Sequence, residues 1–217
     1  MITEKDHLQT LNEIRSLMEK SSRFISLSGL SGVFAGIFAL LGTAAVFIFY
    51  NDFFYPRYYN LGVYLREDLI HGKDLSNFLI FSFIDAALIL LFAIGFAIFF
   101  TTRRARKNGQ SIWDATIKRL LINTFIPLAT GGLFCIALLY HKQIYLIAPA
   151  TLVFYGLALL NASKYTLNEI KYLGISEIII GLIASVYVGY GLIFWAFGFG
   201  ILHIVYGAIM YFKYEKV

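Results

Sequence analysis

The sequence predicts an all-α protein: a polytopic membrane bundle of six transmembrane helices. Of its 217 residues, 59% are hydrophobic and only 14% are charged, and the mean hydropathy is +0.72. A soluble domain carries about 25% charged residues, so too little polar surface remains here to cover a water-soluble globule. The charged residues also fall mostly between long apolar runs, as expected if lipid surrounds those runs.

The N-terminal segment, residues 1–25, predicts an amphipathic helix outside the membrane. Its apolar residues recur at three- and four-residue spacing, which places them on one helical face; they are Leu8, Leu11, Ile14, Leu17 and Met18. We expect this helix to lie on the lipid headgroups and lead into the first span. A docking or dimerisation helix is the alternative.

The remainder, residues 26–217, predicts the six-helix transmembrane domain. A span needs about 20 mainly apolar residues. Six segments qualify: 26–49, 76–100, 120–140, 143–161, 172–190 and 192–212. The last two are separated only by the turn residues Gly189, Tyr190 and Gly191.

Lysine and arginine predict the orientation. They concentrate in the N-terminal segment, in the loops after the second and fourth spans and at the C-terminus, with few on the other side. Because cytoplasmic loops carry the excess of basic residues, we expect both termini in the cytoplasm. The net charge of +5 is thus explained without a nucleic-acid partner. One cluster beside the second span predicts contact with anionic lipid headgroups; it consists of Arg103, Arg104, Arg106 and Lys107.

Three ionisable residues lie inside the apolar runs and form the candidate binding site: Asp85, Glu177 and His203. A charge at membrane depth is costly, so such residues usually face protein and often mark a functional site. Glu177 and His203 each lie 13 residues from Tyr190, on opposite sides of the turn. Equal distances from a turn predict equal depth, so we expect these two side chains to approach each other. The alternative is that each residue is a local hydrogen-bonding contact that holds helices together.

Small residues share a helical face with both members of the expected pair, and we expect both faces to contact neighbouring helices. The first face contains Gly181, Ser185 and Gly189 with Glu177, and the second contains Ala196, Gly200 and Gly207 with His203.

Four stretches together resemble a family of small bacterial integral membrane proteins of unknown activity. They read SSRFISLSGLSGVFAGIFALLG, IPLATGGLFCIALLY, APATLVFYGLALLNASKYT and GYGLIFWAFGFGILHIVYGAIMY. The resemblance implies six spans and a bacterial inner-membrane location, but no activity and no site residues.

For function, the sequence favours a non-enzymatic membrane protein. The first hypothesis is a small permease or channel-like protein, linked to a proton or small-molecule substrate, whose polar interior contains the three buried ionisable residues. The second is a non-transporting scaffold, sensor or accessory subunit, and the third is an enzyme acting on lipid or quinone. Phosphate-loop, zincin, CxxC and GxSxG motifs do not occur, so we predict no metal and no cofactor. A homo-oligomer is compatible with the sequence.

Overall fold

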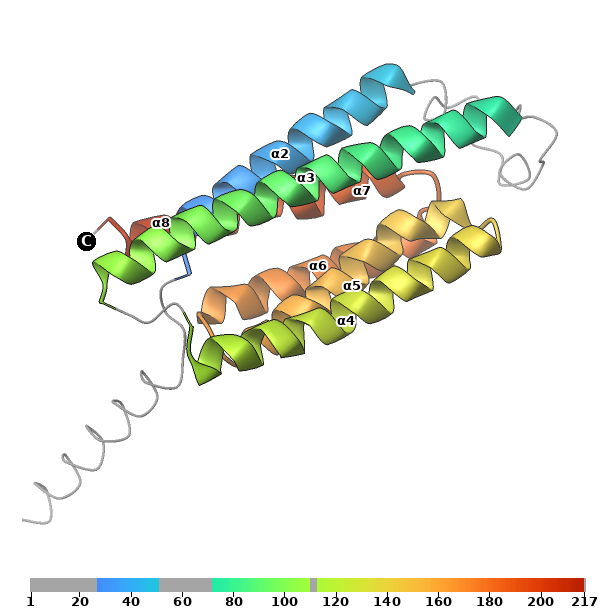
Figure 1. Cartoon of the computed structure of the whole chain (residues 1–217). Helices are drawn as coiled ribbons and strands as arrows, with labels where there is room; N and C mark the ends of the chain where they lie inside the picture. Colours follow the sequence, from blue (N-terminus) through green and yellow to red (C-terminus); the bar gives the residue numbers. More distant parts are fainter. Residues whose placement is uncertain (1–26, 51–71, 110–112, 217) are drawn as a thin grey trace, which may run out of the picture.

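The structure is a computed structural model that describes residues 27–50, 72–109 and 113–216, and the regular elements in these ranges are helical (Figure 1). The expected N-terminal helix over residues 1–25 lies outside the described residues. The helices are α2 (Gly29–Phe49), α3 (Gly72–Lys107), α4 (Ala115–Tyr140), α5 (Ile147–Ala162, after the 3-10 turn η4, Ile144–Leu146), α6 (Asn168–Val186), α7 (Gly191–Trp195), η5 (Ala196–Leu202) and α8 (His203–Tyr214). The elements α7, η5 and α8 follow one another without a break and are called the last helix below.

Five helical segments within the described ranges are long and apolar enough to cross a membrane. They are Gly29–Phe49, Ser76–Lys107, Ala115–Tyr140, Ile144–Ala162 and Gly191–Tyr214. The helix α6 has 19 residues but contains Glu169, Lys171 and Glu177. The helical fold is therefore as expected, while a sixth crossing by α6 stays a prediction.

The bounds of three helices, α3, α4 and α6, differ from those expected. The helix α3 continues past residue 100 to Lys107, because arginine and lysine form helices readily and cations suit a helix C-terminus. The helix α4 begins at Ala115, five residues early, because the Asp114 carboxylate caps it by accepting from the Ile117 amide at 2.8 Å. The helix α6 begins and ends four residues early, and its C-terminal turn contains Gly189 with a left-handed φ of 97°.

The helices of the described ranges form two groups of three that lie side by side (Figure 1). In one group, α5 packs against both α4 and α6, and in the other, α2 packs against both α3 and the last helix. The last helix also contacts α5 and α6, so it joins the two groups. The helices α3 and α4 pack chiefly against one neighbour each and leave most of their apolar side chains exposed. Such an outward apolar surface suits lipid.

Glycines set the closest helix contacts. A Cβ added to Gly29 of α2 would come within 3.0 Å of backbone atoms of Gly207 and Tyr211 in α8. A Cβ on Gly174 of α6 would lie 2.8 Å from the Gly156 carbonyl oxygen of α5. Bulkier residues would force these helices apart, as is general for small residues between membrane helices.

The small-residue face expected on α6 is only partly correct. Gly181 is buried beside Glu177, but Ser185 is exposed and Ala184, at 1% exposure, is buried in its place. A step of four residues overshoots one helical turn by about 40°, so the contact face drifts away from a strict four-residue spacing. Gly189 lies beyond the end of the helix.

The end of the bundle that carries the Arg103–Lys107 cluster, called the basic end, is held by an ion pair. Glu169 at the start of α6 accepts hydrogen bonds from the Lys213 ammonium at 2.6 Å and from the Tyr214 hydroxyl at 3.0 Å. Burial alone would raise the pKa of the Glu169 carboxyl, but these two hydrogen bonds, a hydrogen bond from its own backbone amide and the lysine charge outweigh it and lower the pKa below its usual 4.5. This contact joins α6 to α8.

Candidate functional site

The candidate site is formed where α5, α6 and the last helix meet. The helix α6 places Glu177 there, and its side chain is fully buried at 0% exposure. Its position follows from close packing, since Gly174 and Gly181 on the same helix bring the α5 backbone within contact distance. Glu177 therefore faces protein, as expected for an acid inside an apolar run.

His203 is the first residue of α8 and is 6% exposed. Its Nδ1 lies 3.0 Å from the Gly198 carbonyl oxygen, and its Nε2 lies 2.8 Å from the Tyr155 hydroxyl of α5. Because a carbonyl oxygen only accepts, Nδ1 must carry a hydrogen. In the neutral imidazole, Nε2 then accepts the hydrogen of the Tyr155 hydroxyl. The ring is thus fully hydrogen-bonded without a charge.

The structure brings Glu177 and His203 together, as their equal distance from Tyr190 predicts. Glu177 Oε1 lies 3.4 Å from His203 Nδ1. Neither carboxylate oxygen has a hydrogen-bond partner among the described residues. The Nδ1 hydrogen is directed to Gly198, so the contact with Glu177 is electrostatic rather than a good hydrogen bond. A buried carboxylate without a donor is costly when ionised.

A π-helical segment supplies the carbonyl that holds the imidazole. Residues Ala196–Leu202 form this segment, called η5. Such segments are rare and frequently occur at functional sites. Gly198 lies within it, and a Cβ there would lie 2.6 Å from Leu152 Cδ2 and closer still to Glu177 Oε2. The absence of a side chain at Gly198 therefore makes room for the Glu177 carboxylate.

Aromatic rings enclose one side of the imidazole. Phe199 stacks on His203 with ring centres 5.9 Å apart, and Tyr155 is tilted against both rings. Trp195 extends the row, 4.8 Å from Phe199. These contacts fix the imidazole plane and leave Glu177 as its acidic neighbour.

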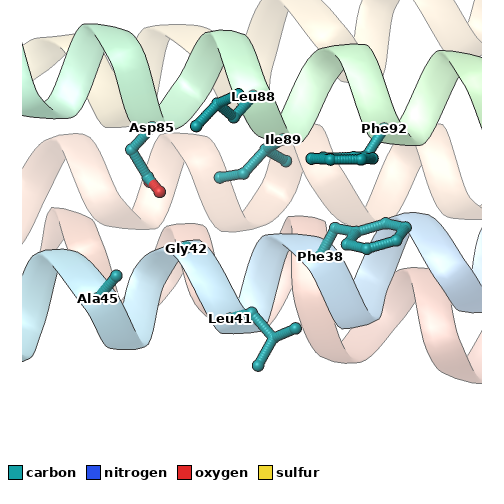
Figure 2. A pocket seen from close by; sticks show the side chains of 8 residues that line it. All are labelled: Phe38, Leu41, Gly42, Ala45, Asp85, Leu88, Ile89 and Phe92. Carbon is teal, nitrogen blue, oxygen red and sulfur yellow. The ribbon is translucent and has the colours of Figure 1, made fainter.

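Asp85 does not join this pair. The side chains around it come from α2 and α3, whereas Glu177 and His203 belong to α6 and α8. Figure 2 shows the Asp85 carboxylate directed from α3 toward α2, in a groove whose other end is bounded by the rings of Phe38 and Phe92. The three residues therefore do not share one polar interior. Glu177 and His203 form a buried pair, and Asp85 lies in a separate groove.

The basic cluster also divides into two parts. Arg103, Arg106 and Lys107 are exposed at the end of α3. The side chain of Arg104 is only 11% exposed, and it turns toward the protein instead of toward lipid headgroups.

Arg104 joins the ends of three helices. It donates to the Leu27 carbonyl before α2 and, at 2.9 Å, to the Tyr214 carbonyl at the end of α8. It also lies 3.4 Å from the Glu215 carboxylate. Glu215 in turn accepts from the first amide of α2, Gly29, at 2.5 Å, where a negative charge is favoured. This role was not expected from the sequence.

Sequence reasoning also missed Tyr155 and Gly198. A signal existed for each. A tyrosine deep in an apolar run needs a partner for its hydroxyl, and Gly198 stands five residues before the buried histidine. Across the described ranges, no group of three or more His, Cys, Asp or Glu could hold a metal ion.

Comparison with known proteins finds no matching family, no matching curated protein and no matching solved structure.

Proposed function

We propose that this chain is a small proton-linked permease or channel-like protein, and that Glu177 and His203 bind its exchangeable proton. One observation carries the proposal: a fully buried carboxylate has no hydrogen-bond donor among the described residues and lies 3.4 Å from an imidazole. A carboxyl and an imidazole are both groups that can gain and lose a proton, and ionisable residues at membrane depth often form proton relays.

The pair holds one proton in two arrangements that have the same net charge. In the neutral arrangement the proton is on Glu177, and His203 accepts from Tyr155. In the charged arrangement the proton is on His203 Nε2, so the Tyr155 hydroxyl must rotate and accept. Losing that proton altogether leaves an uncompensated charge in the core, which is expensive. A positively charged substrate bound near Glu177 would offset the cost of losing the proton. Release of the proton would then favour substrate binding, which couples the two movements.

Proton exchange at the pair can be tested by infrared difference spectroscopy of the purified protein across pH. We expect a carboxyl band that disappears in Glu177→Gln and shifts in His203→Gln, and a histidine titration that changes in Glu177→Gln. Asp114→Asn is the matched control, because it removes an acid at an exposed helix cap where asparagine caps equally well. An unchanged histidine titration in Glu177→Gln would contradict the pairing.

Movement of protons can be tested in proteoliposomes that contain a pH-sensitive dye. We expect a flux above that of empty liposomes for the wild type and for Asp114→Asn, and a flux at background for a folded Glu177→Gln. The competing hypothesis is a non-transporting scaffold, sensor or accessory subunit. It predicts background flux for every variant together with a changed unfolding free energy in Glu177→Gln.

We further propose a bacterial inner-membrane location with the basic end in the cytoplasm and the exposed Arg103, Arg106 and Lys107 at anionic headgroups. The excess of basic residues at this end supports the orientation. The test uses Lys107→Cys and Lys142→Cys in a Cys135→Ser background, with a membrane-impermeant maleimide applied to right-side-out vesicles. Labelling at residue 142 alone is expected, and labelling at residue 107 alone would reverse the orientation.

A further inference from the structure

The groove between α2 and α3 combines one acid with apolar walls. Asp85 of α3 lies beside Gly42 of α2, and the rings of Phe38 and Phe92 stack 5.3 Å apart at the other end (Figure 2). The groove holds about 230 Å³. This is less than the roughly 300–1,000 Å³ of typical drug-sized sites, so a ligand of about one ring fits.

The groove opens to the surroundings of the bundle. Leu41 and Leu88 at its rim are 61% and 50% exposed. Asp85 lies nine residues inside the predicted span that begins at residue 76, which is about 14 Å along a helix. The hydrocarbon core is about 30 Å thick. The acid thus lies near the middle of the bilayer. It is accessible from the hydrocarbon chains but too deep to contact the lipid headgroups.

The Asp85 carboxylate has no hydrogen-bond donor and no ion-pair partner among the residues that the structure describes. A carboxylate at membrane depth requires a counter-charge or a proton. The nearest lining residues are apolar, so the described part of the chain supplies neither a cation nor a donor there. A ligand that complements this groove carries one positive charge on an apolar body.

We propose that the α2–α3 groove binds a small hydrophobic organic cation, an alkyl or aryl ammonium that enters from the lipid. The ammonium pairs with the Asp85 carboxylate, and its apolar body lies between the rim leucines and the Phe38 and Phe92 rings. Gly42 is required for this arrangement, because a Cβ there would lie 2.8 Å from Asp85 Oδ2 and closer to the Ile89 side chain. The site is independent of Glu177 and His203.

The test measures binding of 2-phenylethylammonium to the full chain in lipid nanodiscs by calorimetry, with empty nanodiscs subtracted. We expect saturable one-to-one binding to the wild type and to Asp114→Asn, which removes an acid elsewhere. Binding should weaken at least tenfold in Asp85→Asn, which keeps the shape of the side chain, and also in Gly42→Ala. The neutral analogue 2-phenylethanol should bind at least tenfold more weakly to the wild type.

Three results would overturn the proposal. These are the absence of saturable binding to the wild type, equal binding by Asp85→Asn, and equal binding of the alcohol and the ammonium. A change from oligomer to monomer in Asp85→Asn without any ammonium binding would assign the groove to a second copy of the chain instead. Thermal unfolding of each variant shows whether it remains folded. Because Asp85→Asn leaves Glu177 and His203 intact, its effect is separate from the proton-exchange test above.

Discussion

Replacing Gly198 with alanine should separate Glu177 from His203. The new Cβ would lie 2.6 Å from Leu152 Cδ2, whereas real contacts of this kind begin near 3.0 Å and are comfortable from 3.4 Å. Leu152 is itself fully buried, so Leu152 must move by roughly 0.4–0.8 Å, and the Glu177 carboxylate, which lies closer, must move further. Overpacking of this kind costs about 1–3 kcal/mol.

The control is Gly132→Ala in α4, where a Cβ would meet nothing within 4 Å. Both variants gain up to about 1 kcal/mol from the preference of alanine for helix. The free energy of unfolding should therefore be about 1–3 kcal/mol lower for Gly198→Ala than for Gly132→Ala. The assay is loss of helical circular dichroism as dodecyl sulfate replaces a mild detergent, together with the infrared band of Glu177. Equal stability and an unchanged band would refute the contact between Gly198 and the carboxylate.

Three further changes test the remaining contacts. Glu169→Gln should lower the free energy of unfolding at neutral pH by removing the pair with Lys213. Because the folded pKa of Glu169 is below 4.5, the difference from wild type should persist above pH 4.5 and shrink as pH falls below it; a pH-independent difference would contradict this. Arg104→Gln should cost about 1–3 kcal/mol in chemical unfolding because buried carbonyls lose their donor, and exposed Arg103→Gln, the control, should cost less than about 0.5 kcal/mol. Tyr155→Phe removes the donor to the buried imidazole and should lower proton flux while the protein stays folded, and an unaltered flux would exclude a role for this hydroxyl.

Five of the six expected apolar helices and the approach of Glu177 to His203 could be predicted from the sequence. Hydropathy reports how long each apolar run is, and a tight turn makes positions at equal distance from it level with each other. Helix ends were less predictable. The charged residues after the second apolar run were expected to form a loop, but Arg103–Lys107 continue α3. Arginine and lysine are good helix formers, so a charged segment outside the lipid can be helix as well as loop.

The direction in which each side chain points could not be predicted. Arg104 and Arg103 are adjacent in sequence, yet among the described residues only Arg104 contacts carbonyls, because Leu27 lies just before α2 and Tyr214 ends α8 beside it. Asp85 and Glu177 both occur in apolar runs, but α3 packs chiefly against one neighbour and α6 is held between others. These outcomes depend on which helices are adjacent in space, and one sequence contains no direct record of that.

The π-helical segment Ala196–Leu202 has a consequence for how this chain tolerates insertions and deletions. In an α-helix the carbonyl of Gly198 would be bonded by the amide four residues later, but a wider turn holds one residue more. Deleting a single residue here would let the last helix continue as a regular α-helix, with little change to α7 before the segment or to α8 after it. The imidazole would then lose its backbone acceptor. We therefore expect the shortened chain to insert and fold normally, yet to lose the proton exchange proposed for Glu177 and His203.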